Sequence, residues 1–411
     1  MATTHSLDPP LPLPALLTAA PHRLLFLVGA VNVLAGMAWW AAWLLALRFQ
    51  LWAPPQPPVP AGWGHALVMG FQVFTPFIFG FLLTVFPRWL GQPPLSRWHY
   101  VPVGGGLFGG QLLVLAGLWG HPHLLHLGVL ATLAGWIAGL AVLASVLRQA
   151  RAPDWHARSM LLALSLGLAG LLCFAAWLHA QQHGLLAFAA FKLAMLGFLL
   201  PVYLTVAHRM LPFFASCVLS GYRAWKPLWL LGALWLLIAA LLALELAHAY
   251  AWLWLASLPL TVLCLGWLLR IWPAGPMPGL LRVLFLGMAW LPMAFALYTA
   301  QSLVMAFTGE FVLGRAPVHA LAVGFFGSLL VAMVTRVSQG HSGRPLRMPA
   351  VAWFAFAMVQ LTAVARIAAE LAVDTWAWQA WAAVTWLLAF VPWVLRGLYL
   401  WLTPRADGAP G

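Results

Sequence analysis

Charge is scarce in this sequence of 411 residues: Asp, Glu, Lys and Arg make up 7% of it, whereas hydrophobic residues make up 64%. Soluble globular domains carry roughly 25% charged residues, so this chain cannot cover a water-exposed surface. Its apolar stretches are long and do not alternate with polar residues, which argues against a transmembrane β-barrel. The sequence therefore predicts an all-α polytopic membrane protein, because a helix satisfies its own backbone hydrogen bonds in lipid.

Acidic residues are scarcer still, with 7 Asp and Glu against 20 Lys and Arg. Almost none lies inside an apolar run, which argues against a proton pump built on carboxylate relays. The basic residues form no clustered arm, so we do not expect nucleic-acid binding. Cysteine is rare too: Cys173, Cys217 and Cys264 lie far apart and form no CxxC motif or disulfide framework. Walker A, GxSxG and HExxH motifs are absent, and no internal repeat is convincing.

What the sequence does contain is a series of apolar runs, each about 20 residues long, as a membrane span requires. They predict a transmembrane bundle of about twelve helices over residues 22–402, between a flexible Pro-rich N-terminal tail (1–21) and a C-terminal tail (403–411). The predicted spans begin near His22, His65, Val101, His123, Ser159, Leu185, Pro227, Tyr250, Leu280, Val318, Met348 and Thr375. Most Lys and Arg residues follow even-numbered spans or lie near the two ends, which predicts that both termini are cytoplasmic.

Histidine is the polar residue that stands out in this sequence, with 14 residues. An imidazole in a bilayer needs a partner or a metal, and both haem iron and copper accept it. We identify six candidate haem ligands: His22, His65, His179, His208, His319 and His341. His65 and His319 each open a span beside small residues, which would let a flat macrocycle approach the helix.

Copper has a weaker candidate site. His179 and His183 are four residues apart and share one helix face. This spacing suits a metal, but a solvated helix end explains the two histidines equally well.

Two cations within predicted spans need an explanation. Lys192 could neutralise a haem propionate, pair with an acid that the sequence does not identify, or extend its amine to the membrane surface. Arg366 could serve a propionate in the same way, or pair with Glu370 four residues later.

Several segments resemble the NnrS family, bacterial membrane proteins of the nitric oxide response that contain haem and copper. The segment HALAVGFFGSLLVAMVTRVSQGHSGRPL, from His319 to Leu346, resembles the family signature HALTxGxxG…MTRxSLGHTGRPL. The segment GHALVMGFQVFTPFIFGFLLTVFPRWLGQPPL, from Gly64 to Leu95, resembles the family's second-span block. HRMLPFF at His208–Phe214 and GMAWLP at Gly287–Pro292 match shorter family motifs.

Departures from the family pattern concern metal ligands. Trp63 and Ala66 stand where the second-span block has a histidine and a glutamate, and Phe285 stands where the family often has a histidine. His65, His319 and His341 carry over directly, and His179 does so through a histidine near the end of span five. His208 replaces a residue that is often glycine in the family.

The resemblance implies a bacterial inner-membrane protein that binds haem b, and with less support copper, and that responds to or detoxifies nitric oxide. A ferrous haem held by one histidine has an open position for this small ligand. The resemblance does not identify an electron donor or decide whether the protein is an enzyme. The alternative is a metal-free permease or an assembly factor for respiratory enzymes, since spans two, six and nine contain prolines at which transporter helices often break.

Overall fold

The computed structural model describes residues 12–180 and 184–407. Within that part of the chain, twelve helical segments are long and apolar enough to cross a membrane, which confirms the predicted fold class and the number of spans. In chain order, spans 1 to 12 are α2 (Pro21–Phe49); α3 (Ala61–Val68), η1 (Met69–Val73) and α4 (Thr75–Trp89); η2 (Arg97–His99) and α5 (Val101–Gly117); α6 (Pro122–Arg148); α7 (Trp155–Ala180); α8 (Gly184–Lys192), η3 (Leu193–Leu199) and α9 (Leu200–Val218); α10 (Leu228–Leu246); η4 (Tyr250–Trp252) and α11 (Trp254–Ile271); α12 (Gly279–Met288) and α13 (Trp290–Thr308); α14 (Ala316–His319), η5 (Ala320–Gly327) and α15 (Ser328–His341); α16 (Ala350–Ala368); and α17 (Thr375–Trp401).

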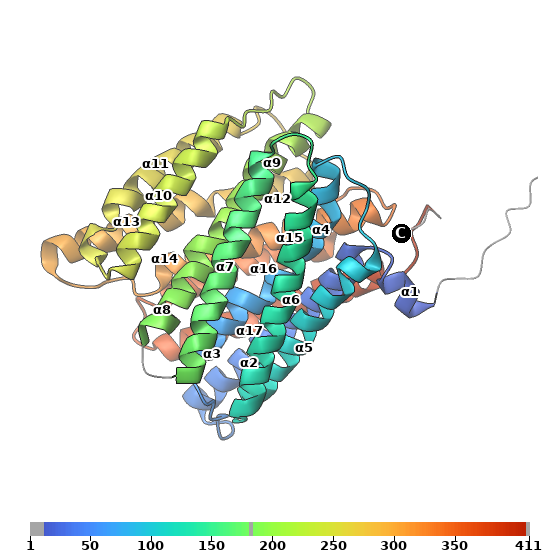
Figure 1. Cartoon of the computed structure of the whole chain (residues 1–411). Coiled ribbons are helices and arrows are strands. Elements are labelled where there is room, and N and C mark those ends of the chain that lie inside the picture. The colour runs from blue at the N-terminus through green and yellow to red at the C-terminus, as the bar shows by residue number, and fades with distance from the viewer. Residues whose placement is uncertain (1–11, 181–183, 408–411) are drawn as a thin grey trace, which may run out of the picture.

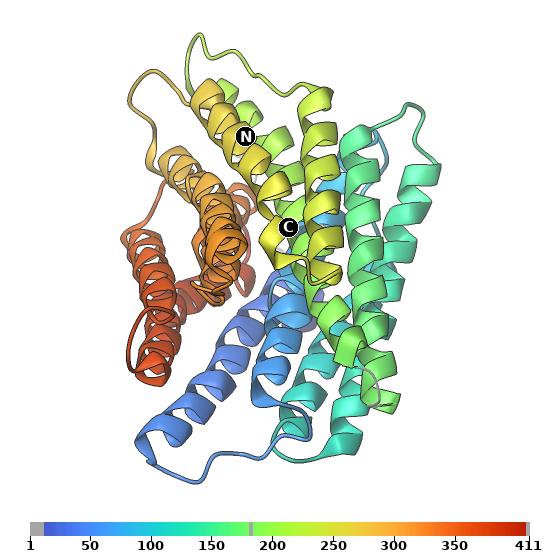
Figure 2. The same cartoon turned by 90° about the vertical axis from the view of Figure 1, so that its left-hand side faces the viewer.

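The first and last spans are neighbours. Helix α17 packs against both α16 and α2, so the C-terminal spans lie beside the N-terminal ones, as the red and blue helices of Figure 2 show. Helices α5, α6 and α7 pack side by side along another part of the bundle (Figure 1). In the apolar 18-residue stretches of spans 2 and 10, 89% and 78% of the residues are buried, the largest shares among the twelve spans. These two spans therefore form the interior.

Three spans contain a π-helical segment: η1 in span 2, η3 in span 6 and η5 in span 10. Such wide turns are rare and are frequent at functional sites. Span 2 shows how the backbone next to such a wide turn keeps its hydrogen bonds. Pro76 cannot donate a hydrogen bond to the carbonyl of Gln72, four residues earlier. The Asn32 side chain of α2 donates to that carbonyl oxygen instead, at 2.9 Å.

Glycine allows spans 3 and 4 to pack with their backbones in contact. A Cβ atom added at Gly106 would lie 2.6 Å from the Cα atom of Gly135, and one added at Gly128 would lie 2.5 Å from the backbone nitrogen of Val114. Small residues are the usual means of close helix packing in lipid, where apolar burial alone does not drive helices together.

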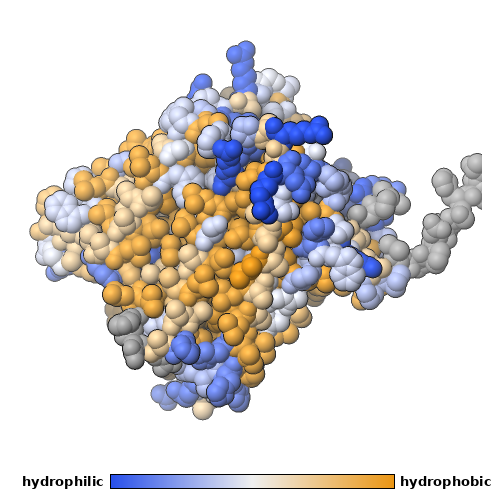
Figure 3. Space-filling model, viewed as in Figure 1, coloured by the Kyte–Doolittle hydropathy of each residue, from blue (hydrophilic) through white to orange (hydrophobic). Residues whose placement is uncertain are grey.

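The two ends of the bundle differ in charge, and a broad apolar surface lies between hydrophilic ends (Figure 3). We call one end the arginine-rich end; its loops and helix ends carry Arg88, Arg97, Arg148, Arg209 and Arg344. We call the other the acidic end; it carries Glu310, Glu370 and Asp374. Which end faces the cytoplasm stays a prediction.

Both ends of the described chain lie at the arginine-rich end, where Figure 1 shows α1 (Leu13–Leu17) near the C-terminus. Arg23 Nη1 donates to the carbonyl oxygen of Thr403 at 2.9 Å. The Tyr100 hydroxyl donates to the carbonyl oxygen of Thr18 at 2.7 Å. The described part of the predicted N-terminal tail is thus helical in part and is held against span 3.

Candidate functional site

Two of the six candidate haem ligands come together at the acidic end. His65 lies in α3 of span 2 and His319 ends α14 of span 10, and each stands just before a π-helical segment. The two side chains lie close enough to interact electrostatically, and each also interacts with Arg366 and Arg315. We call these two residues the His65–His319 pair.

The His319 ring has one nitrogen engaged. Its Nδ1 lies 2.9 Å from the carbonyl oxygen of Arg315, an acceptor, so Nδ1 carries the proton and donates. In a neutral imidazole this leaves Nε2 with a free lone pair. A backbone carbonyl that fixes the tautomer in this way is the usual outer partner of a metal-binding histidine.

His65 is positioned by stacking instead of hydrogen bonding. Its ring lies parallel to Trp40 of α2, with centroids 4.5 Å apart and 14° between the planes. Its Nδ1 atom is buried and has no hydrogen-bond partner in the described part of the chain. Buried polar atoms are nearly always paired, so this nitrogen indicates a missing ligand or water.

Arg366 pairs with an acid, one of the two roles considered for it. Its Nη1 lies 2.6 Å from Glu370 Oε1, and the arginine is 7% exposed. Glu370 is held closely: a Cβ atom at Gly314, where φ is +38°, would overlap the Glu370 Oε2 atom. The pair supplies a fixed, nearly neutral group beside the His65–His319 pair.

Lys192 also has a partner. Its amine lies 2.7 Å from Glu245 Oε2 and 5.1 Å from the centroid of Phe188. Glu245 is 2% exposed, so the ion pair is enclosed between spans 6 and 7. Of the roles considered for Lys192, the structure shows the pairing with an acid, and it identifies that acid as Glu245.

A second histidine pair lies at the arginine-rich end. His22 begins span 1 and His341 ends span 10, and their ring centroids are 4.4 Å apart with 39° between the planes. His22 is 3% exposed, and its Nδ1 has no hydrogen-bond partner in the described chain. We call these residues the His22–His341 pair.

A third pair joins His208 to His156, which is not among the six candidate haem ligands. His156 Nε2 lies 2.9 Å from His208 Nδ1, and His208 Nε2 donates to the carbonyl oxygen of Pro227 at 3.1 Å. Both ring nitrogens of His208 are therefore engaged, and binding a metal would require it to give up a partner. The signal that could have found this pair is topological, since the start of span 5 and the end of span 6 must lie at the same end.

In the described part of the chain, the structure shows no set of ligands at the predicted copper site. His179 is exposed at the end of α7, and His183 lies outside the described residues. Within residues 12–180 and 184–407, no three His, Cys, Asp or Glu side chains gather into a metal site. Trp63 and Phe285, which stand where the family pattern has histidines, pack against other aromatic residues: Trp63 contacts Trp177, and Phe285 contacts Trp272.

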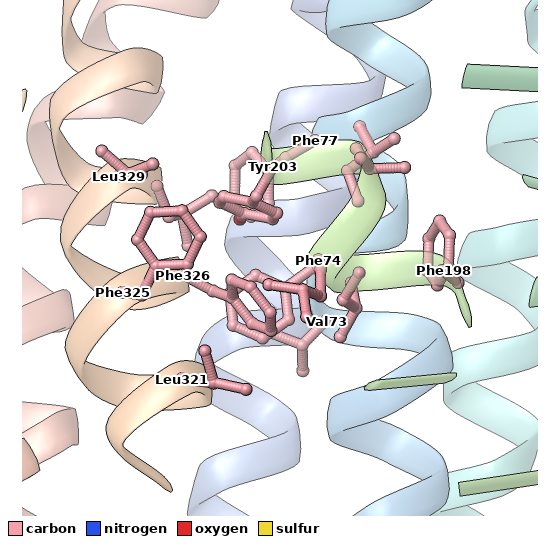
Figure 4. Close-up of a cluster of buried hydrophobic side chains, with 14 of the residues drawn as sticks. Val73, Phe74, Phe77, Phe198, Tyr203, Leu321, Phe325, Phe326 and Leu329 are labelled. Atoms are coloured by element: carbon pink, nitrogen blue, oxygen red, sulfur yellow. The ribbon is translucent and has the colours of Figure 1, made fainter. Parts of the chain in front are cut away.

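Between the two ends, the interior is apolar. Figure 4 shows Phe325 and Phe326 of η5 facing Phe74 and Tyr203 from spans 2 and 6, and the Tyr203 and Phe326 ring centroids are 4.6 Å apart. Beside them an apolar cleft runs between spans 1, 2, 6 and 10. Its lining includes Tyr203, whose hydroxyl is the main polar group there.

Comparison with known proteins gives one result. A family profile described as NnrS protein matches residues 16–405, nearly the whole chain. No curated protein matches the sequence.

Proposed function

Because the chain belongs to the NnrS family, we propose that it is a haem-binding membrane protein that handles nitric oxide, with haem held by His65 and His319. The observation that carries this proposal is the free Nε2 of His319, fixed by the bond from Nδ1 to Arg315. The unpartnered Nδ1 of the nearby His65 ring supports it.

The surroundings of the pair suit a haem. Ala66 and Ala320 follow the two histidines directly, and their small side chains leave room for a macrocycle beside each helix. Arg315 interacts electrostatically with both imidazoles and would balance one carboxylate of a haem, whereas Arg366 is already paired with Glu370. Trp40 holds the His65 ring in one orientation by stacking.

If one of the two histidines ligates the iron and the other lies beside it, haem would supply an iron centre that can bind a diatomic molecule. Nitric oxide is small and uncharged, so it can reach such a centre through lipid. The protein contributes an apolar interior between spans 2, 6 and 10, which excludes water and charged competitors.

The test is an optical spectrum of the detergent-purified protein, oxidised and reduced, with and without nitric oxide, beside metal analysis for iron and copper. Soret absorption that shifts with nitric oxide supports the proposal. Absence of iron and of visible absorption would reject it in favour of a permease or an assembly factor.

We also propose that the arginine-rich end faces the cytoplasm of a bacterial inner membrane, because basic loops remain on that side. Reporter fusions after Arg97 and after Arg158 are expected to report cytoplasm, and a fusion after Pro57 is expected to report periplasm. The reverse pattern would overturn this orientation.

A further inference from the structure

Buried polar side chains without partners gather in one part of the bundle, between spans 1, 2 and 3. Their atoms that have no hydrogen-bond partner in the described part of the chain are Trp39 Nε1, Gln111 Nε2 and Oε1, Asn32 Oδ1, Gln72 Oε1 and Thr75 Oγ1. We call these five residues the polar row, and none of them is more than 4% exposed. Buried polar atoms are nearly always paired, so the polar row indicates a ligand that the protein itself does not supply.

Contacts between neighbouring spans hold the polar row together. Asn32 Nδ2 donates to the carbonyl oxygen of Gln72 at 2.9 Å, and Gln72 Nε2 donates to Thr132 Oγ1 of span 4 at 2.9 Å. Gly36 lies one helical turn beyond Asn32, and a Cβ atom added there would lie 3.4 Å from Gln111 Nε2. The amides of spans 1, 2 and 3 therefore lie next to one another.

The polar row runs from the acidic end to the middle of the membrane. Trp39 is its outer member, because a Cβ atom added at Gly64, near the start of span 2, would lie 3.4 Å from the Trp39 ring. Asn32 lies seven residues earlier, about 10 Å deeper along the helix, and Thr75 is the middle residue of the 29-residue span 2. One turn beyond Trp39, Trp43 lines an open pocket of about 480 Å³ at the acidic end, so the outer member lies close to solvent.

The chemistry of the unpaired atoms identifies the kind of molecule that fits them. The indole of Trp39 only donates, the oxygens of Asn32 and Gln72 only accept, and the amide of Gln111 does both. A cation would need acceptors alone and an anion donors alone, and none of the five side chains is charged. The occupant is therefore small, neutral and able both to donate and to accept, as water is when it bridges buried polar groups.

We propose that the polar row binds a chain of water molecules through which protons enter from the acidic end as far as the middle of the membrane. Leaving these atoms unpaired would be costly, and bound water removes that cost. The side chains hold and orient the water, and each water molecule accepts one proton and releases another to the next. No member of the polar row changes its charge in this process.

This water route is separate from the apolar cleft. Phe74, which directly precedes Thr75, faces Tyr203 of span 6 and Phe326 of span 10 (Figure 4). Gln72 instead contacts spans 1 and 4. Span 2 thus has an apolar side toward the cleft and a polar side toward spans 1, 3 and 4. The route also needs no cofactor, so its test and the test of the proposed function can fail independently.

Bound water is tested by X-ray radiolytic labelling of the full-length detergent-purified protein, followed by mass spectrometry. Radiolysis turns bound water into hydroxyl radicals that oxidise the side chains beside it. Trp39 should be labelled although it is buried. Trp136 is the matched control, because it is a buried tryptophan of span 4 whose Nε1 donates to the carbonyl oxygen of Leu164 at 3.0 Å. Labelling of Trp39 no greater than that of Trp136 would overturn the proposal.

Proton passage is tested by deuterium exchange of the Trp39 indole N–H, measured by ¹⁵N NMR, because exchange requires hydronium or hydroxide to reach that group. Gln111→Leu removes an amide that holds the water, and it should slow this exchange about tenfold. Gln379→Leu, at a buried glutamine of span 12, is the matched control and should leave the rate unchanged. An equal exchange rate in Gln111→Leu and the wild type would overturn the route.

Thermal unfolding of the same variant separates a hydrated row from a dry one. In a dry row, Gln111→Leu would remove two unpaired polar groups and raise the melting temperature. In a hydrated row it removes partners of bound water, so we expect no rise, and a rise would contradict the proposal. If Gln111→Leu fails to fold, Gln111→Met replaces it in all measurements, because an unbranched apolar side chain adapts to the same space.

Discussion

The two histidine pairs lie near opposite ends of span 10, yet their surroundings differ. At the acidic end, two arginines face carboxylates: Arg366 pairs with Glu370, and Arg48 with Asp374. At the arginine-rich end, cations around His22 and His341 outnumber the carboxylates among the described residues. The imidazoles of the His65–His319 pair thus lie in a nearly neutral environment, whereas those of the His22–His341 pair lie in a positive one.

The largest expected effect comes from removing a ligand at the acidic end. His319→Ala or His65→Ala should abolish the Soret absorption of the haem proposed at this pair and lower the iron content to match. Absorption spectra and iron analysis measure this. His123→Ala, an exposed histidine at the same end, should change neither quantity. A wild-type spectrum in both ligand variants would remove the His65–His319 pair from consideration.

A second prediction concerns the ion pair between Arg366 and Glu370 at the acidic end. Gly314→Ala places a methyl group onto Glu370 Oε2 at a backbone φ of +38°, which should displace the carboxylate from Arg366. We expect a loss of about 2 kcal/mol in stability and a melting temperature lower by several degrees, measured by thermal unfolding in detergent. Gly105→Ala meets nothing within 4 Å and serves as control. Equal melting temperatures would show that Glu370 is not held as the structure describes.

The contrast in charge can be tested by potentiometry. Arg366→Gln removes a cation beside His65 and His319 and leaves Glu370 unpaired. We expect the midpoint potential of the acidic-end haem to fall by tens of millivolts, on the order that local charge usually sets. A rise in this potential, or no change, would contradict the placement of Arg366 beside the proposed haem.

The smallest effect is expected at the third pair, where the arginine-rich end does contain a carboxylate. Partial burial tends to raise the pKa of Asp154, but the Ala157 N–H bond and Arg209 outweigh it and lower the pKa overall. The ionised group therefore stabilises the fold above its unfolded pKa of about 3.9, and this contribution is lost as pH falls through the lower folded pKa. Asp154→Asn should cost about 1 kcal/mol near pH 7, with a melting-temperature gap that closes below about pH 4. A gap that widens in acid would refute this.

Hydropathy was sufficient to predict the number of spans, because a span is a local property of about 20 residues. The resemblance to a family led to His65, His319 and His341. Neither could predict which histidines meet, because pairing depends on which spans neighbour one another. His22 meets His341 because span 12 packs against both span 1 and span 10. His156 was not among the candidate ligands for the same reason, since its partner lies in another span.

Ion pairing was predictable only where it is local. Arg366 and Glu370 are four residues apart on one helix, so their pairing was considered from the sequence. Glu245 lies in span 7, far from Lys192 in sequence, and the pair forms because α8 packs against α10. The π-helical segments had no sequence signal beyond Pro76 and Pro201, and η5 has no proline at all.

The π-helical segment η5 lies between the two histidines of span 10, and it has a consequence for how this protein can change. Each residue of an α-helix turns the chain by about 100°, whereas a π-helical turn takes up one additional residue without rotating the helix on either side of it. Deleting a single residue from Ala320–Gly327 would therefore let this segment return to α-helical geometry, with His319 and His341 each keeping its face of the span. The same deletion in α15, which has no wide turn to absorb it, would rotate one histidine relative to the other.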